Sequence, residues 1–362
     1  LGLKLHTPMM QKYAQRGTTS INLNTLSSQQ QRLILTKPVI EGPRQVGFDH
    51  FHGISASLDM PPYLYIHNNN FTDGENIHMK PKSKPGRQGM SSTSFSHVEV
   101  LDALASNATE FLNSNIRKGG PPIFLYLPLT SPHTPIVPSR AFRGKSDLGP
   151  YGDLVMQTDD VVGRIISTLT RLNSLDDTLI LFTSDNGFAQ ATLSNPANAF
   201  LHPHFPSGIF RGMKSDIYEG GHRIPFIVQW PGVVQPRTIN KTPISLVDLF
   251  ATFLDITHQS VGYKDIRKNH GEDSTTSLLP LFMEKCGHRR LETSCVTGSE
   301  NNILSELTYR IQRKQLVMHS ISGCFAIREG KYLLALCSNS GGTAVLLLSR
   351  MIESSPVTMS CD

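Results

Sequence analysis

The sequence lacks any apolar run approaching the ~20 residues that a membrane-spanning helix needs. It also lacks clusters of lysine and arginine interleaved with aromatic residues, and this absence argues against nucleic acid as a partner. Tryptophan occurs once, and charged residues make up 17% of the chain against 38% for apolar residues. This balance is typical of a globular protein rather than a disordered one. The net charge of +5 is a mild basic excess that suits a protein collecting small anions.

Cysteine is scarce and unevenly placed, and no two cysteines form a C-x-x-C pair. All five lie in the last quarter of the chain, at Cys286, Cys295, Cys324, Cys337 and Cys361. Their spacing is compatible with disulfides in an exported protein, with one cysteine left over, and it leaves the pairing open. Asn-x-Thr triplets at Asn70, Asn107 and Asn240 are compatible with export as well. The chain begins at Leu1 without a charged and then apolar leader, so we expect processing or truncation to have removed what came before.

Apolar periodicity predicts an α/β fold, and 362 residues suffice for one large core and a smaller domain. Short apolar runs predict buried strands at 123–127, 179–182 and 226–230. Helical spacing predicts helices at 98–112 and 154–172, and a third helix that Thr242 caps and Pro243 begins. This order predicts a mostly parallel central sheet flanked by helices. We predict a poorly patterned segment at 1–40, the α/β domain at 41–262 and a small α+β domain at 263–362.

The most informative segment is the glycine-rich loop (residues 208–225), which fixes its backbone with glycines and a proline and carries charged side chains. The predicted apolar strand 226–230 follows at once, so we expect the loop to lie at the edge of a buried sheet. We expect Glu219 and Arg223 to form a structural ion pair. Lys214 then remains as the candidate anion-binding residue of the loop.

Two further polar clusters follow predicted strands, where open α/β sheets bind ligands. His133 lies in the Ser-Pro-His-Thr-Pro segment 131–135, and Asp185 and Asn186 follow the strand 179–182. A carboxylate beside an amide oxygen suits calcium or magnesium. Taken alone, Asp-Asn-Gly is an ordinary turn and a histidine between prolines is usually structural. Their combination with Lys214 favours a site for a metal ion and an anion.

From Gly42 to about residue 340 the chain resembles a sulfatase of the arylsulfatase type, in the alkaline phosphatase superfamily. The segments that carry this resemblance are 42–51, 55–63, 131–135, 182–187, 211–225 and 323–328. The resemblance implies hydrolysis of small-molecule or carbohydrate sulfate esters, with one calcium ion and a formylglycine nucleophile made from the cysteine of a C-x-P-S-R motif. It implies a secreted, periplasmic or lysosomal location for the complete protein.

Carried onto this sequence, the resemblance makes Asp185 and Asn186 calcium ligands. His133 would contact the sulfate and help to protonate the leaving oxygen. Lys214 would hold the sulfate oxygens and neutralise charge that develops in the transition state. The calcium ion would polarise the sulfuryl group.

The chain departs from the family pattern at its start. The acidic D-D-x-G pair, the C-x-P-S-R motif and the G-K-W-H segment are absent. Residues 136–140 contain Pro-Ser-Arg, but isoleucine replaces the cysteine, and Asp159 and Asp160 lie within a helical stripe where solvated carboxylates are expected. The tail from Thr343 to Asp362 is also unlike the family. We therefore expect this polypeptide to be inactive as written and, without a first parallel strand, to expose apolar faces.

Two alternatives stay open. One is a phosphatase or phosphonate monoester hydrolase of the same superfamily, because the missing nucleophile would decide between them. The other is a protein without catalytic activity, either an inactive sulfatase fragment or a binder of sulfate esters.

Overall fold

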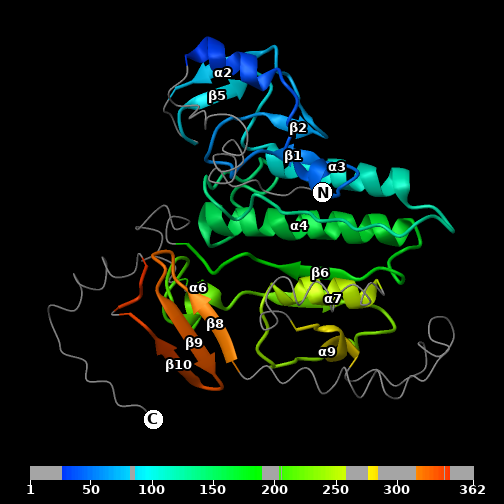
Figure 1. Cartoon of the computed structure of the whole chain (residues 1–362). Coiled ribbons are helices and arrows are strands. Elements are labelled where there is room, and N and C mark those ends of the chain that lie inside the picture. The colour runs from blue at the N-terminus through cyan, green and yellow to red at the C-terminus, as the bar shows by residue number, and fades with distance from the viewer. Residues whose placement is uncertain are drawn as a thin grey trace. The chain divides into compact units, whose positions relative to one another are not determined.

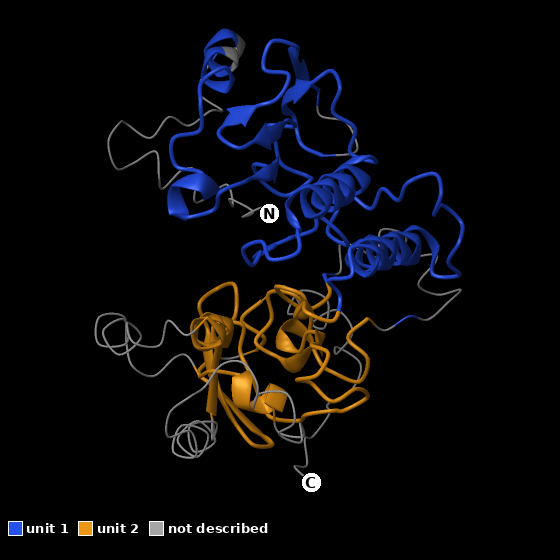
Figure 2. Cartoon of the chain, turned by 90° about the vertical axis from the view of Figure 1, so that its right-hand side faces the viewer, with its two compact units in different colours: residues 1–175, 189–204 blue, residues 176–188, 205–362 orange. Residues whose placement is uncertain are grey.

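In a computed structural model, residues 27–81, 86–189, 204, 206–257, 276–283, 315–337 and 339–342 are described. Contacts divide the chain into two compact units (Figure 2). Unit 1 comprises residues 1–175 and 189–204, and unit 2 comprises residues 176–188 and 205–362. The domain boundaries predicted at residues 40 and 262 stay a prediction. No helix in the described part of the chain combines the length and apolar character that a membrane span requires.

Unit 1 contains short antiparallel strands and two long helices (Figure 1). In chain order its elements are α2 (Ser28–Leu35), the 3₁₀ helix η2 (Pro43–Val46), β1 (His52–Ile54), β2 (Tyr65–His67), β3 (Asn70–Phe71), β4 (Ile77–Lys80), β5 (Gly89–Ser92), α3 (Val100–Asn115) and α4 (Gly149–Arg171). Strands β1, β2 and β3 form one sheet, and β4 pairs with β5 in another.

The two long helices confirm the predicted helical periodicity. Leu101 and Ala105 of α3 pack against Leu154 and Val161 of α4, so the apolar stripes of both helices bury one another. The helices lie side by side in Figure 1. The exposed carboxylates of Asp159 and Asp160 lie on α4, as the helical stripe predicted.

Three histidines cluster on one side of the first sheet. His52 lies directly opposite His67 in the β1–β2 register, and their ring centroids are 6.1 Å apart. His50 lies 5.1 Å from His67 and stacks on Phe111 of α3, while His52 stacks on Tyr65. Burial, with the neighbouring His67 and His50, lowers the pKa of His52 to about 4. His52 is therefore held neutral in the folded chain.

Unit 2 holds the remaining described elements: β6 (Ile180–Thr183), α6 (Glu219–His222), β7 (Phe226–Gln229), α7 (Asp248–Ile256), α9 (Leu279–Met283), β8 (Gln315–His319), β9 (Phe325–Glu329) and β10 (Tyr332–Ala335). Strand β6 pairs with β7, and β8, β9 and β10 form a three-stranded sheet (Figure 1). The predicted cap at Thr242 is wrong, because α7 begins at Asp248. There the buried Asp248 carboxylate accepts hydrogen bonds from the Ser245 and Thr276 amides, at 2.8 and 2.9 Å.

The α/β class is confirmed, but the predicted parallel sheet is not found in the described residues. Every pair of named strands there is antiparallel, including β6 with β7. Apolar runs carry no strand direction, and the chain reverses between β6 and β7. The predicted burial of the strand 226–230 is also wrong, because Ile227 of β7 is 60% exposed. The predicted strand 123–127 belongs to no described sheet, and its Phe124 and Tyr126 are 59% and 44% exposed.

We expect the histidine cluster to make unit 1 less stable in acid. In the unfolded chain the pKa of His52 returns to its usual value near 6.5, so its stabilising contribution is complete above that pH and is lost as the pH falls towards 4. Between pH 7.5 and 5, His52 accounts for a loss of about 1–2 kcal/mol in the free energy of unfolding. Urea titrations followed by helical circular dichroism measure it. The His52→Phe variant should show a shallower pH dependence, and an equal slope in both proteins would contradict the expectation.

Candidate functional site

Lys214 lies at the tip of a tight turn in the glycine-rich loop. Gly212 and Ser215 on either side both adopt left-handed backbone angles, with φ of +84°. The buried Asp216, 1% exposed, closes the turn from within. Its carboxylate accepts a hydrogen bond from the Met213 amide, and its own amide donates to the Met213 carbonyl, both at 3.0 Å. The backbone that carries Lys214 is therefore fixed by the chain itself.

Asp185 and Asn186 occupy the turn that follows β6. The Ser184 hydroxyl donates to the Asn186 carbonyl at 3.0 Å, and the Asn186 side-chain amide donates to the Gly187 carbonyl at 3.1 Å. Because the amide nitrogen is used in this way, the Asn186 side-chain oxygen remains available as a ligand. The Asp185 side chain is exposed. It has no hydrogen bond or ion pair to any residue that the structure describes.

The glycine-rich loop and the Asp185 turn are joined by backbone hydrogen bonds. The Lys214 amide donates to the Phe188 carbonyl at 2.7 Å, and the Gly187 amide donates to the Gly221 carbonyl at 2.9 Å. Asp185, Asn186 and Lys214, predicted as parts of one site, therefore lie on directly connected backbone within unit 2.

Glycine is required where these two segments meet. A Cβ atom on Gly187 would lie 1.9 Å from the Gly220 carbonyl oxygen, and one on Gly220 would lie 2.0 Å from the Gly212 carbonyl oxygen. The opposing atoms belong to the backbone and cannot rotate away. Gly220 also donates its amide to the Arg211 carbonyl at 2.7 Å. The absence of side chains thus permits the close approach.

Glu219 forms ion pairs with two arginines, one in the loop and one on β9. Its carboxylate binds Arg223 at 2.7 Å, which confirms the predicted ion pair. It also binds Arg328 of β9 at 2.7 Å, a partner that sequence reasoning missed because 109 residues separate the two. In contrast, the Lys214 ammonium has no ion-pair or hydrogen-bond partner among the described residues. Lys214 therefore carries positive charge that is available to an anion.

His222 is a half-buried histidine of the glycine-rich loop. Burial lowers its pKa, and the nearby His319 adds to the effect. Its Nε2 atom is buried and has no hydrogen-bond partner within the described residues. A neutral imidazole in this position leaves the positive charge of the loop to its lysine and arginines.

His133 belongs to unit 1. Its amide donates to the Thr130 carbonyl at 3.2 Å. Its Nδ1 lies 2.7 Å from the Thr134 carbonyl oxygen, which can only accept, so Nδ1 carries the proton. Nε2 is then the nitrogen that can take up and release a proton. Because Asp185, Asn186 and Lys214 belong to unit 2, the convergence of all three predicted clusters stays a prediction.

The oxygen atoms after β6 are of the type that a hard cation binds, but they are too few to complete its coordination. Asp185 and Asn186 offer carboxylate and amide oxygens, which calcium prefers. Calcium takes about 6–8 oxygen ligands, and no group of three or more His, Cys, Asp or Glu side chains gathers to hold a metal within the described ranges. Asp185 and Asn186 alone would supply only part of a calcium coordination sphere.

Comparisons with known proteins agree on one family. The sulfatase family profile matches residues 11–259. An N-acetylgalactosamine-6-O-sulfatase from Bacteroides thetaiotaomicron is 31% identical over 254 residues, which cover 60% of this chain and 49% of that protein. A steryl-sulfatase from Rattus norvegicus is 38% identical over 153 residues, covering 42% of this chain and 26% of that protein. The chain thus spans about half the length, or less, of these curated relatives.

A solved structure supports the same relationship. It is a sulfatase from the glycosaminoglycan metabolism of Bacteroides thetaiotaomicron, with a TM-score of 0.61 and 25% identity. The match covers 83% of this chain and 64% of that chain. The alkaline phosphatase-like α/β fold expected from the sequence is therefore confirmed.

We expect Gly220→Ala to destabilise unit 2 by about 3 kcal/mol, because the new methyl group would meet the Gly212 carbonyl. The sole tryptophan, Trp230, directly follows β7, so its fluorescence reports urea unfolding of unit 2. Gly163→Ala is the matched control. A Cβ on that helical glycine meets nothing within 4 Å, and the change should stabilise α4 by about 1 kcal/mol. Equal unfolding free energies for Gly220→Ala and the natural protein would refute the close-contact argument.

Proposed function

Because the chain belongs to the sulfatase family, we propose that the complete protein hydrolyses sulfate esters, and that its substrates are sulfated carbohydrates. The observation that carries the proposal is the Lys214 ammonium, which has no described partner and lies on a loop fixed against the Asp185 turn. Relatives named N-acetylgalactosamine-6-sulfatase support a sugar sulfate as substrate. A sulfate monoester is a small anion, which suits this arrangement of charge.

The chain's own residues supply binding and proton transfer in the proposed reaction. Lys214 holds the sulfuryl oxygens and offsets the negative charge that grows on them as the S–O bond breaks. His133 donates a proton from Nε2 to the leaving alcohol oxygen, while its Nδ1–H stays on the Thr134 carbonyl. Asp185 and Asn186 would hold calcium, which when bound polarises the sulfuryl group. The balanced reaction consumes water and releases an alcohol, sulfate and a proton.

Residues 1–362 lack the nucleophile that the proposed reaction requires. Residues 1–362 contain no cysteine in a C-x-P-S-R setting, so they have no position for a formylglycine. This polypeptide supplies anion-binding and metal-binding groups without a nucleophile. That observation favours a second candidate for residues 1–362 taken alone, namely a binder of sulfate esters without turnover.

The proposed location is a compartment outside the cytosol, either secreted, periplasmic or lysosomal. Cys324 and Cys337 form a disulfide, and disulfides persist mainly in oxidising compartments. The structure thereby resolves one pairing that the cysteine spacing left open.

We expect Lys214→Met to lower kcat/KM of the complete protein by about 10²–10³-fold, because the transition-state charge loses its countercharge. Release of 4-nitrophenol from its sulfate ester, and of sulfate from a sugar 6-sulfate, measures the effect. Lys118→Met removes an exposed lysine of unit 1 and should leave the rate unchanged. Residues 1–362 alone should show no turnover. Hydrolysis of 4-nitrophenyl phosphate in preference to the sulfate would instead support the phosphatase alternative.

We expect calcium to raise the unfolding temperature of the complete protein, since a ligand that binds only the folded state stabilises it by mass action. At a concentration 100 times its dissociation constant, the added stability is about 2.7 kcal/mol. Asp185→Asn should reduce the shift, while Asp177→Asn, a nearby unit 2 control outside the proposed site, should not. An identical shift in the natural protein and Asp185→Asn would remove Asp185 from the metal site.

A further inference from the structure

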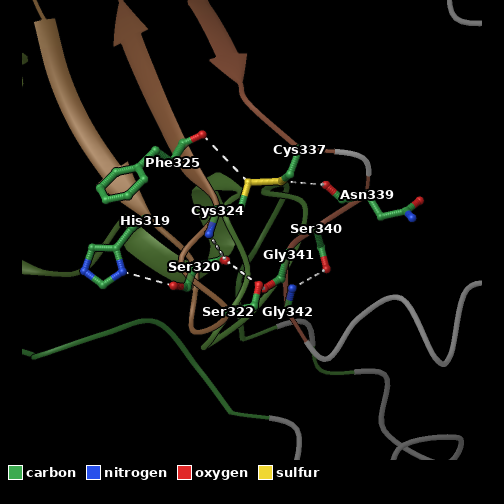
Figure 3. The surroundings of a disulfide bond; sticks show 10 residues. All are labelled: His319, Ser320, Ser322, Cys324, Phe325, Cys337, Asn339, Ser340, Gly341 and Gly342. Atoms are coloured by element: carbon green, nitrogen blue, oxygen red, sulfur yellow. Dashed lines mark hydrogen bonds between the residues drawn. A yellow bond between two sulfur atoms is a disulfide. The ribbon is translucent and has the colours of Figure 1, made fainter.

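The Cys324–Cys337 disulfide joins the two ends of the β9–β10 hairpin (Figure 3). Cys324 directly precedes β9, and Cys337 follows β10 by two residues. Their Cα atoms are 5.8 Å apart. The Leu336 amide donates to the Phe325 carbonyl at 2.8 Å, so the hairpin remains paired up to the disulfide. Two short segments lie next to it: residues 320–323, which connect β8 to β9, and residues 339–342, which follow Cys337.

These two segments contact one another beside the disulfide. Ser320 donates its amide to the Cys324 carbonyl at 2.8 Å, and its hydroxyl accepts from the Cys324 amide at 3.2 Å. The Ser322 hydroxyl donates to the Gly341 carbonyl, as Figure 3 shows. A Cβ on Gly341 would lie 2.7 Å from the Cys324 Cβ. The segments are therefore packed together against Cys324.

Both segments also bind the backbone on the C-terminal side of Lys214. The Ile321 amide donates to the Ser215 carbonyl at 3.0 Å, and the Ile217 amide donates to the Ser340 carbonyl at 2.9 Å. A Cβ on Gly342 would lie 2.5 Å from the Ser215 carbonyl oxygen. Ser215 has the left-handed backbone that turns the chain directly after Lys214. Each segment thus shares one hydrogen bond with the backbone that follows Lys214.

We propose that the Cys324–Cys337 disulfide is a positioning element for Lys214, acting through these two segments. Without the covalent link, the segments separate more easily and the Ile321–Ser215 and Ile217–Ser340 hydrogen bonds open to water. The Lys214 turn then loses its outer support while Asp216 still closes it from within. The role in catalysis rests on the proposed sulfate ester hydrolysis, whereas the mechanical link does not.

Hydrogen exchange of single amides tests the mechanical link. In the Cys324→Ser/Cys337→Ser variant of the complete protein, the Ile217 and Ile321 amides should exchange at least tenfold faster than in the natural protein. The Ile327 amide within the β8–β9–β10 sheet, and amides of α7, serve as internal controls and should change less than threefold. Unchanged exchange at Ile217 and Ile321 in a folded variant overturns the proposal, as does equal acceleration at the control amides.

If the double variant does not fold, the natural protein is folded first and then reduced with a phosphine. Water supplies the oxygen of the phosphine oxide and the two thiol protons. Exchange is pulsed before global unfolding, and the same tenfold criterion applies to Ile217 and Ile321. Failure of this criterion rejects the proposal whether or not the protein hydrolyses sulfate esters.

Kinetics of the complete protein separate positioning from simple stabilisation. Reduction should raise KM for an aryl sulfate and the inhibition constant of inorganic sulfate, each about tenfold, and reoxidation should restore both. A disulfide that only stabilises the fold would lower the unfolding midpoint and leave both constants unchanged, and that result overturns the proposal. A protein with no sulfatase activity would refute the proposed function, while the exchange experiment would still decide the mechanical link.

Discussion

The candidate site depends on contact between two backbone segments without side chains between them. Gly187 and Gly220 each face a carbonyl oxygen at a distance that excludes a Cβ atom. This contact allows the hydrogen bonds from Lys214 to Phe188 and from Gly187 to Gly221, which join the glycine-rich loop to the turn after β6. The spacing between the backbone of a candidate metal-binding turn and that of a candidate anion-binding lysine is thus set by direct backbone contact.

The charged side chains of the glycine-rich loop differ in whether they have a partner. Glu219 lies between Arg223 and Arg328 and binds both, so these cations serve the structure. His222 is kept neutral by burial, which lowers its pKa. Arg211 lies over the Tyr218 ring, 4.0 Å from its centroid, whereas Lys214 has no ion-pair, hydrogen-bond or ring partner among the described residues. Among the described residues of the loop, the Lys214 ammonium is therefore the cation that has no partner.

Local sequence features predicted much of this arrangement. Periodicity located α3 and α4, the Asp-Asn-Gly turn followed a predicted strand, and the opposite charges of Glu219 and Arg223 within one loop predicted their ion pair. What sequence reasoning missed lies far apart along the chain. Neither the strand direction of β6 and β7 nor the contacts of Arg328, Ile321 and Ser340 with the loop can be read from periodicity, because they arise only when distant segments meet.

The division of the candidate groups between two units separates two chemical tasks. The contacts that hold Lys214, Asp185 and Asn186 lie within unit 2, from the glycine contact to the disulfide. His133, the candidate proton donor, is held within unit 1 by its own backbone neighbours. Under the proposed function, affinity for sulfate thus depends on bonds internal to unit 2. Under the same proposal, proton transfer needs the His133 Nε2 atom within about 2.6–3.2 Å of the leaving oxygen. Under the proposed function, a change that loosens the glycine-rich loop weakens binding, whereas a change at His133 slows turnover of substrate that is still bound.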